Sequence, residues 1–498
     1  MTAQPPFFQT PHLSAPVEVT EATGTSDAGE LLPDAPHRVP RELLARLDVS
    51  GPRYTSYPTA DRFVEAFGPD DYGQALLQRA EGGGAVGGTF TPLSLYVHIP
   101  FCESVCYYCA CNKVITKHHE RADEYLVALK GEIDLVVKQL GKGQSVSQLH
   151  FGGGSPTFLS DEQLEDLLAF MRDRFKFVPG GEYAIEVDPR TVDAGRIQRL
   201  AGMGFNRLSL GVQDFDPHVQ VAVHRVQSYA QVEALMIAAR AAGFESINMD
   251  LIYGLPKQSP QTFARTLEQV VALRPDRVAL YAYAHLPQRF KPQRRIDADQ
   301  LPKADDKLTM LTQAIDILGA HGWDYIGMDH FALHHDSLAV ARRQGRLHRN
   351  FQGYSTQPDS DLIGLGVSAI GRVGPHYSQN AKTLDEYYDA IRRQSLPVVR
   401  GMTLTRDDLV RRAVIMAIMC QGRVDFESIN LAYLLDFQQY FGPELSQLQP
   451  LIESGLVELE SDGIRVTPMG WYFVRAIAMV FDRHLQADQN RQRFSRII

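Results

Sequence analysis

The sequence predicts an α/β protein whose main domain is a partial (βα)6 TIM-like barrel, with an N-terminal extension and a helix-rich C-terminal domain. Strand-like and helix-like segments alternate six times between residues 93 and 320, which is the pattern of parallel strands joined by crossover helices. A glycine-rich stretch, Glu81 to Gly88, precedes them and reads as a linker. From about Leu404 a helix-rich pattern replaces the alternation.

The six expected strands are short apolar runs, and each is followed by a segment with the apolar spacing of a helix face. The strands are expected at 93–99, 147–151, 183–187, 206–210, 247–252 and 278–283. The helices are expected at 121–140, 161–175, 192–203, 228–242, 260–273 and 304–320. Because barrels of this type carry their chemistry at the carboxyl ends of the strands, polar residues there are the candidates for a functional site.

Five segments are expected along the chain. Residues 1–35 are rich in Pro, Ala, Thr, Glu and Asp without an apolar period, so they are expected to form a flexible extension. Residues 36–90 are expected to pack on the barrel, which occupies 91–330. Residues 331–403 are expected to connect the domains and complete the active site, and 404–498 to form the helix-rich domain.

Composition excludes several classes of protein. With 498 residues, 44% hydrophobic and 22% charged, the chain can bury a sizeable core and is neither fibrous nor wholly disordered. Fifty Lys and Arg against 59 Asp and Glu give a net charge of −9, which argues against a nucleic-acid binder. Its apolar stretches are too short to span a membrane and Met1–Thr10 lacks a signal-peptide pattern, so a cytoplasmic protein is predicted.

Four of the five cysteines lie between Cys102 and Cys111, directly after the first expected strand. Cys102, Cys106 and Cys109 have C-x3-C-x2-C spacing, so three thiolates on one short loop can bind three irons of a [4Fe–4S] cluster and leave the fourth iron open. A structural zinc site is the alternative, but no second C-x2-C pair is present to complete it. Cys111 is not assigned to iron, and the distant Cys420 is expected to be a core thiol.

Further polar and glycine residues follow the next strands. Gly152–Gly154 has no side chains to keep its backbone amides from a ligand, although a flexible turn explains the glycines equally well. Taken singly, an acidic residue at a strand end is as often a helix cap or part of a surface ion pair. Four polar residues on successive strand ends indicate a shared site: Glu186, Gln213, Arg225 and Asp250.

The cysteine loop resembles the signature of radical S-adenosylmethionine enzymes, and the motifs around it resemble those of oxygen-independent coproporphyrinogen III oxidases. The similar segments include Tyr96-Val-His-Ile-Pro-Phe-Cys102, Gly152-Gly-Gly-Ser-Pro-Thr157, Glu186-Val-Asp-Pro-Arg190, Asp250-Leu-Ile-Tyr-Gly-Leu-Pro-Lys257 and His348-Arg-Asn-Phe-Gln-Gly-Tyr354. The resemblance runs from Arg53 to Ile498. One departure is Ser155, where the family has Thr, and it keeps the hydroxyl.

The resemblance implies two cofactors. A [4Fe–4S] cluster would be held by Cys102, Cys106 and Cys109, with S-adenosyl-L-methionine chelating its open iron, and a second S-adenosylmethionine is expected nearby. The residues implied to contact these molecules are Tyr96, Tyr108, Gly153, Gly154, Ser155, Glu186, Gln213, Arg225, Asp250 and the backbone of Ala284 and Ile370.

The activity implied is the oxidative decarboxylation of the ring A and ring B propionates of coproporphyrinogen III to vinyl groups, through a 5′-deoxyadenosyl radical. The product would be protoporphyrinogen IX, in haem biosynthesis. The implied partners are coproporphyrinogen III and an electron donor such as a flavodoxin-type protein, and the chain is expected to be a monomer. Candidate cations for the substrate carboxylates follow the sixth strand, where a solvated basic loop is the alternative: Arg289, Lys291, Arg294 and Arg295.

Two other functions are compatible with the same fold. A haem-binding chaperone of the superfamily typically has Cys-x-Tyr-Cys-Asp-Phe where this chain has Cys106-Tyr-Tyr-Cys-Ala-Cys111, and it lacks the segment Arg53–Ala60, so these differences favour the oxidase. A radical enzyme acting on RNA is disfavoured because the chain is acidic and has no basic stripe interleaved with aromatic residues.

Overall fold

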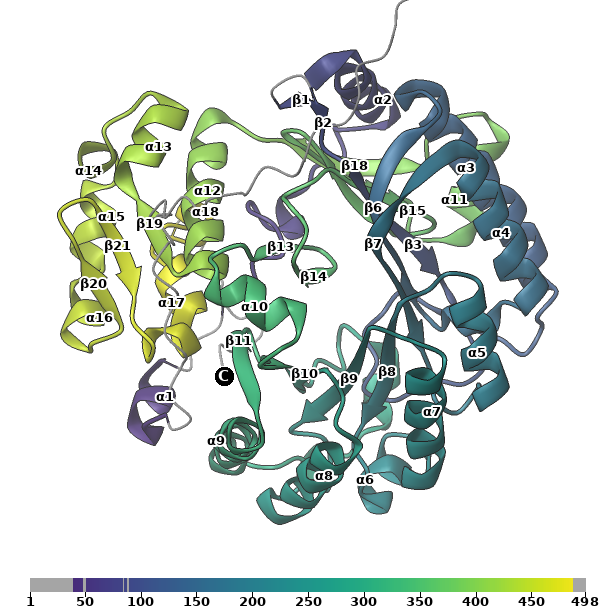
Figure 1. The fold of residues 1–498 in the computed structure, drawn as a ribbon, viewed down its shortest axis with the longest axis horizontal. Coiled ribbons are helices and arrows are strands. Elements are labelled where there is room, and N and C mark those ends of the chain that lie inside the picture. The colour runs from purple at the N-terminus through teal and green to yellow at the C-terminus, as the bar shows by residue number, and fades with distance from the viewer. Residues whose placement is uncertain (1–38, 48–50, 84, 87–88, 487–498) are drawn as a thin grey trace, which may run out of the picture.

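The computed structural model of this chain describes residues 39–47, 51–83, 85–86 and 89–486. At its centre is a mixed sheet of twelve strands in the order β11-β12-β10-β9-β8-β7-β6-β3-β15-β16-β17-β18 (Figure 1). The expected flexible extension, residues 1–35, lies outside the described residues.

Six consecutive strands of this sheet are parallel and form the expected barrel units. They are β3 (Leu93–Ile99), β6 (Gln144–Gly153), β7 (Phe175–Val187), β8 (Arg207–Gln213), β9 (Ser246–Tyr253) and β10 (Arg277–Ala282). Their order confirms the predicted α/β fold with a partial (βα)6 barrel. The largest difference is β7, which begins at Phe175 rather than at residue 183, because the strand continues through Pro179-Gly180-Gly181 with a shift in its register against β6.

The outer face of the parallel sheet is covered by helices (Figure 1). They are α3 (Arg121–Leu140), α4 (Asp161–Arg174), α5 (Ala194–Gly202), α7 (Tyr229–Ala241), α8 (Pro260–Leu273) and α9 (Ala304–Ala320). Local sequence sets their starts. Ser160 accepts a hydrogen bond from the Gln163 backbone N–H at 3.2 Å, while the Gln163 side chain accepts one from the Ser160 N–H at 2.9 Å. A short helix that was not predicted, α6 (Pro217–Ala222), begins where Asp216 caps it.

The sheet continues past both ends of the six strands, where the sequence had shown no clear alternation. On one side β11 (Trp323–Gly327) and β12 (His330–Leu333) pair antiparallel with each other, and β12 pairs with β10. On the other side β15 (Leu362–Leu365) runs parallel to β3 and leads to β16 (Ile370–Val373), β17 (His376–Asn380) and β18 (Val398–Thr403). Helices α10 (Ser337–Arg343) and α11 (Leu384–Arg392) lie between these strands in the chain.

A hairpin of β13 (His348–Asn350) and β14 (Gly353–Ser355) packs against the inner face of the sheet. The Gln352 side chain donates to the Leu95 carbonyl at 3.2 Å, and the Gln148 side chain donates to the Ser355 hydroxyl at 2.7 Å. This hairpin therefore closes one side of the space that the parallel strands enclose.

The segments that flank the barrel in the chain are helical or short. The N-terminal ones are α1 (Arg41–Leu47), η1 (Ala60–Arg62), α2 (Pro69–Gln78), η2 (Arg79–Gly83), β1 (Ala85–Val86) and β2 (Thr89–Phe90). The C-terminal ones are α12 (Arg406–Gln421), β19 (Arg423–Asp425), α13 (Phe426–Tyr433), α14 (Phe437–Tyr440), α15 (Gly442–Gln447), α16 (Gln449–Glu453), β20 (Val457–Leu459), β21 (Gly463–Val466), η6 (Gly470–Phe473), α17 (Val474–Met479) and α18 (Arg483–Gln486). These helices agree with the predicted helix-rich C-terminal region.

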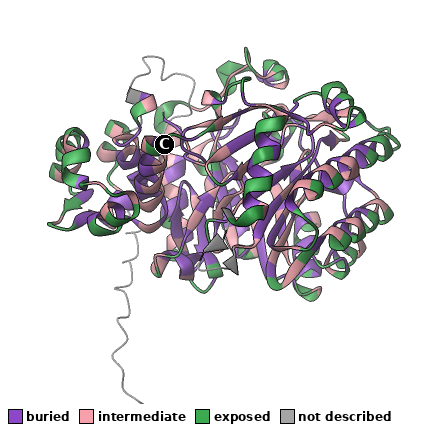
Figure 2. Cartoon of the chain, turned by 90° about the horizontal axis from the view of Figure 1, so that it is seen from above, coloured by how far each residue is buried: buried purple, intermediate pink, exposed green. Residues whose placement is uncertain are grey.

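Buried apolar side chains run continuously from the strands into the C-terminal helices, for example from Leu95 and Ile363 to Ile415 and Phe437. Figure 2 shows the strands buried and the outward sides of the helices exposed. In the part of the chain that the structure describes, none of the helices has the length and apolarity needed to cross a membrane. The core therefore supports the carboxyl ends of β3 to β10, where the candidate residues lie.

Candidate active site

The cysteine loop follows the carboxyl end of β3, and strand pairing fixes both of its ends. Its first residues form β4 (Phe101–Cys102), which pairs in parallel with β5 (Val114–Ile115). Within the loop the Cys109 N–H donates to the Cys106 carbonyl at 3.2 Å. The Lys113 ammonium donates to the Cys109 carbonyl at 3.1 Å. These backbone contacts hold the three predicted iron ligands on one turn above the sheet.

Hydrogen-bond donors from neighbouring strand ends point at the sulfur atoms. Arg225 Nη1 lies 3.3 Å from Cys106 Sγ, and Arg190 Nη2 lies 3.4 Å from the same sulfur. Both guanidinium groups also bind Asp188, at 3.2 and 2.6 Å. The Ser155 hydroxyl lies 3.9 Å from Cys102 Sγ. Positive charge and donors beside a thiol stabilise its thiolate, which is the form that binds metal.

Beside the loop, the glycine segment meets the carboxylate of Glu186 at the end of β7. The Gly153 N–H donates to Glu186 Oε2 at 3.4 Å, and His150 Nε2 donates to Oε1 at 3.0 Å. Burial disfavours the ionised carboxylate, but the hydrogen bonds from His150 and the Gly153 N–H, together with the charges of His150 and His98, outweigh it and lower the pKa of Glu186. A side chain at Gly152 would place its Cβ 2.7 Å from Glu186 Oε1, so the Glu186 carboxylate would have to move from its present position.

Asp250 at β9 lies among hydroxyl and amide donors. It accepts hydrogen bonds from Ser209 Oγ at 3.0 Å and from Asn248 Nδ2 at 2.9 Å. Burial and the nearby charge of Glu186 raise the pKa of Asp250 to about 6. Glu186 and Asp250 therefore form a pair of carboxylates with different proton affinities on neighbouring parts of the rim.

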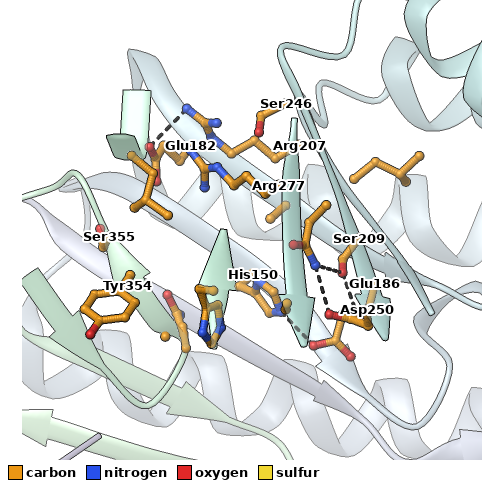
Figure 3. A pocket seen from close by; sticks show the side chains of 18 of the residues that line it. His150, Glu182, Glu186, Arg207, Ser209, Ser246, Asp250, Arg277, Tyr354 and Ser355 are labelled. Atoms are coloured by element: carbon orange, nitrogen blue, oxygen red, sulfur yellow. Dashed lines mark hydrogen bonds and ion pairs between the residues drawn. The ribbon is translucent and has the colours of Figure 1, made fainter. Parts of the chain in front are cut away.

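Two adjoining cavities share this rim. One, of about 280 Å³, is lined by eleven of the predicted residues: Cys102, Cys106, Tyr108, Cys109, Gly153, Gly154, Ser155, Glu186, Gln213, Arg225 and Asp250. The other, of about 200 Å³, reaches into the barrel and shares Glu186, Ser209, Asp250 and Tyr281 with the first. Figure 3 shows Glu186, Asp250 and Ser209 gathered at one end of this inner cavity and Glu182, Arg207 and Arg277 at the other.

Three predicted residues are outside that lining as far as the described residues show. Tyr96 lies close by: its hydroxyl is 3.2 Å from His98 Nδ1, and its ring stacks on His150 at 5.9 Å. Ala284 follows β10, where its carbonyl accepts a hydrogen bond from Gln293 Nε2 at 3.2 Å. Ile370 begins β16 and packs with apolar neighbours of its own. Their cofactor roles stay predictions.

Known proteins match this chain over most of its length. The profile of the Radical SAM superfamily matches residues 96–270, and that of the HemN C-terminal domain matches residues 404–473. The oxygen-independent coproporphyrinogen III oxidase of Pseudomonas aeruginosa is 50% identical over 459 residues, which cover 92% of this chain and 98% of that protein. This chain belongs to the oxygen-independent coproporphyrinogen III oxidase family.

Further relatives agree with this assignment. The oxygen-independent coproporphyrinogen III oxidase of Escherichia coli is 47% identical over 456 residues, covering 92% of this chain and 98% of that protein. A solved structure of coproporphyrinogen III oxidase from Escherichia coli, described as a radical SAM enzyme, superposes with a TM-score of 0.83 and covers 87% of this chain and 98% of that chain. Membership of the oxidase family within the radical SAM superfamily implies a [4Fe–4S] cluster and S-adenosylmethionine as cofactors.

The side chains of this oxidase-family site suit an iron–sulfur cluster better than a single ion. The three predicted ligand cysteines line one cavity, with a hydroxyl donor at Cys102 Sγ and guanidinium donors at Cys106 Sγ. Among the described residues, no three His, Cys, Asp or Glu side chains converge closely enough to hold a single metal ion. Cys111 also lines the cavity.

Several residues of this site were not selected from the sequence. Asp188 joins Arg190 and Arg225, while His150 and Asn248 hold the two carboxylates. A signal for the two strand residues was available, because each is a polar side chain within a predicted strand of a covered parallel sheet, where polar side chains need partners. The sequence did not show which side chains bind one another, because that depends on the register between neighbouring strands.

Proposed function

We propose that this chain converts coproporphyrinogen III to protoporphyrinogen IX by oxidative decarboxylation of the ring A and ring B propionates. The observation that carries the proposal is the convergence of the cysteine loop, the glycine segment and the Glu186–Asp250 rim on one cavity, in a chain 50% identical to a named oxidase of this kind. No observation favours the haem-binding chaperone.

The first task of the protein is to hold the cluster. We assign Cys102, Cys106 and Cys109 as its ligands, and the guanidinium groups of Arg190 and Arg225 stabilise the Cys106 thiolate. Asp188 keeps both guanidinium groups in place through contacts of 2.6 and 3.2 Å. We leave Cys111 without an iron, because a fourth thiolate would close the position that S-adenosylmethionine needs.

The second task is to bind S-adenosylmethionine against the cluster. When bound, the two cofactors would supply the radical chemistry that oxidative decarboxylation of a propionate requires. Gly153 and Gly154 line the cavity without side chains, so the cofactor can approach the backbone closely there. The carboxylates of Glu186 and Asp250 accept hydrogen bonds from its amino or hydroxyl groups. These contacts orient the reacting carbon and keep water out of the cavity.

A second S-adenosylmethionine is part of the proposal. Tyr108 and Gln213 line the outer cavity, and the inner cavity adjoins it through Tyr281 and the two carboxylates, so two molecules can lie next to each other. Ala284 and Ile370 are the residues assigned to these molecules with the least support, since they lie outside the described lining. A flavodoxin-type electron donor and a monomeric state stay predictions from the resemblance.

The test is an anaerobic reaction with coproporphyrinogen III, S-adenosylmethionine and a chemical reductant. The expected product has lost CO2 and two hydrogens from each of two propionates, which mass spectrometry reads directly. Cys106→Ala should lose both iron and product, while Cys111→Ser serves as the matched control and should keep both. Tight haem binding without CO2 release by the parent protein would contradict the proposed function.

A further inference from the structure

Arg53 lies beside the wall that separates the two cavities. Its guanidinium carbon is 5.5 Å from the centre of the Tyr281 ring, and Tyr281 lines both cavities. The Arg53 side chain is 29% exposed, so it is accessible to a ligand yet largely shielded from bulk solvent. Tyr281 also lies near Asp250 and Glu186, whose charges act on its hydroxyl. A guanidinium group thus lies one aromatic ring away from the reaction cavity.

Arg53 differs from the arginines that line the cavities in how closely its guanidinium group is paired with a carboxylate. Each of those arginines already has a carboxylate partner at 2.6–3.2 Å: Arg190 and Arg225 with Asp188, Arg207 with Glu182, and Arg277 with Asp336. The ion pair of Arg53 is the long one, with 4.0 Å between its Nη1 and Asp329 Oδ2. Its Nη2 donates to the Met328 carbonyl at 3.3 Å. The charge of Arg53 is therefore poorly neutralised.

A second, buried guanidinium lies behind Arg53. Arg349 is 4% exposed, and its Nε donates to the Arg53 carbonyl at 3.3 Å, which fixes the backbone of Arg53. Its Nη1 is buried without a hydrogen-bond partner. Burial and the charges of Arg349 and Arg53 lower the pKa of His330 to about 3, so this imidazole stays neutral. Arg53 forms the 4.0 Å ion pair with Asp329, and the charges of Arg475 and Arg349 also act on this buried carboxylate. Positive charge therefore exceeds negative charge around Asp329, which favours binding of a further anion.

We propose that Arg53 binds a propionate carboxylate of the porphyrinogen substrate and that Arg349 positions Arg53 for this contact. The inference rests on the proposed function for the identity of the substrate. A guanidinium group can bind a carboxylate through two parallel hydrogen bonds, and partial burial strengthens the interaction. Residues Arg53 and Arg349 come from distant parts of the chain, so the site exists only in the folded protein.

The carboxylate bound by Arg53 is one that the product retains. A guanidinium group paired with a reacting carboxylate would stabilise the anion that has to leave as CO2, and so would oppose the reaction. A guanidinium group bound to a propionate that does not react does not oppose the reaction. It holds the macrocycle while the ring to be changed faces the cofactor.

The basic loop predicted from the sequence to bind the substrate is less suited to this role. Arg289, Lys291 and Arg294 lie on the exposed surface around η4 (Lys291–Arg295). Arg294 donates to the Pro287 carbonyl at 3.0 Å, and Arg295 stacks over Tyr107 at 5.3 Å. Exposed charges of this kind are screened by water and salt, so each binds a carboxylate weakly.

The test measures porphyrin binding to the cluster-loaded protein by fluorescence. The two probes are coproporphyrin III and protoporphyrin IX, which keeps only the two propionates that do not react. Arg53→Ala is expected to weaken binding of both probes by roughly tenfold or more, the loss typical of a charged hydrogen bond. Arg53→Lys should retain part of the affinity. The matched control is Arg274→Ala, whose guanidinium also stacks on an aromatic ring, that of Trp323 at 5.7 Å, but lies at the opposite end of β10.

Turnover separates this inference from the proposed function. With coproporphyrinogen III, Arg53→Ala should raise KM much more than it lowers kcat, and its iron content and S-adenosylmethionine binding should match the parent. Unchanged affinity for both porphyrins would refute the role of Arg53. Weakening confined to coproporphyrin III would refute the assignment to a retained propionate. If the parent binds porphyrin but forms no product, the proposed function fails while the binding comparison can still be read.

Discussion

Glu132 of α3 is a buried carboxylate that ties three parts of the chain together behind the cavity. It is 2% exposed and accepts hydrogen bonds from the Gly366 N–H at 2.7 Å, the Asn380 side-chain amide at 2.6 Å and the Tyr387 hydroxyl at 2.5 Å. Gly366 follows β15, which pairs with β3 and so supports the cysteine loop. Glu132→Ala would leave three buried donors without this acceptor, and each unsatisfied donor costs about 1–3 kcal/mol. The free energy of unfolding is therefore expected to fall by at least about 3 kcal/mol.

The more specific perturbation is Glu132→Gln, because its effect on stability should depend on pH. Burial raises the pKa of Glu132 to about 7, above its ordinary value of 4.5. A carboxyl group whose pKa is higher in the folded state contributes its stability fully below the unfolded pKa, and that contribution is lost as pH rises through 7. At about 1.4 kcal/mol for each tenfold change in proton affinity, the loss between pH 5 and pH 8 is about 2.5 kcal/mol. Glutamine does not titrate.

The assay is urea unfolding of the cluster-loaded parent and Glu132→Gln at several pH values from 5 to 8. When the free energies of unfolding of the two proteins are subtracted, the contributions of other titrating groups cancel. The free energy of unfolding of the parent should fall by about 2.5 kcal/mol relative to that of the variant between pH 5 and pH 8. The control is Glu124→Gln, on the exposed side of the same helix, for which the difference from the parent should be small at every pH. A parent-to-Glu132→Gln difference that stays constant with pH would refute the reasoning.

Three further changes probe the site. Cys111→Ser should hold as much iron as the parent after anaerobic reconstitution, measured by iron analysis, and loss of the cluster would show that the ligand assignment is wrong. Glu186→Gln should weaken S-adenosylmethionine binding by roughly tenfold or more in calorimetry while keeping the iron, because a charged hydrogen bond is worth about 1.5–3 kcal/mol. Gly154→Ala should prevent cluster assembly, since its Cβ would lie 2.6 Å from the Phe101 carbonyl oxygen; a normal iron content would contradict this.

The parallel core could be predicted from the sequence because its signals are local. The strand expected at 93–99 is β3 as observed, and the helix expected at 121–140 is α3 as observed. Apolar runs, helix periodicity and caps such as Ser160 are enough to place these elements. The strands between residues 330 and 403 were missed, and four of them, β13 to β16, have only three or four residues each, too few for an alternating pattern to emerge. The strand-like segments expected near Leu456 and Ile464 are β20 and β21.

Individual site residues could be predicted where they lie at a strand end or in a motif. The interactions between them could not be predicted. Glu186 and Asp250 were selected as polar residues on the rim, and both line the cavity. The contacts that set their protonation come from His150, Ser209 and Asn248, whose partners depend on strand register. Arg53 and Arg349 meet through a contact between segments far apart in the sequence, which no local pattern reveals.

The open barrel gives the N-terminal segment its place in the site. Six parallel strands do not close on themselves, and the sheet ends at β11 on one side and β18 on the other. Residues beginning at Gly51 lie across this open side: the Arg475 guanidinium donates to the Pro52 carbonyl at 2.8 Å, and the Tyr54 hydroxyl donates to Asp482 at 2.9 Å. Contacts with the C-terminal helices thus fix the residues on both sides of Arg53. A closed eight-stranded barrel would leave no room there for a side chain to approach the cavity from outside the sheet. If Arg53 binds a propionate as we propose, the incomplete barrel and the residues that cover its gap act together to admit and anchor a large, carboxylate-bearing substrate.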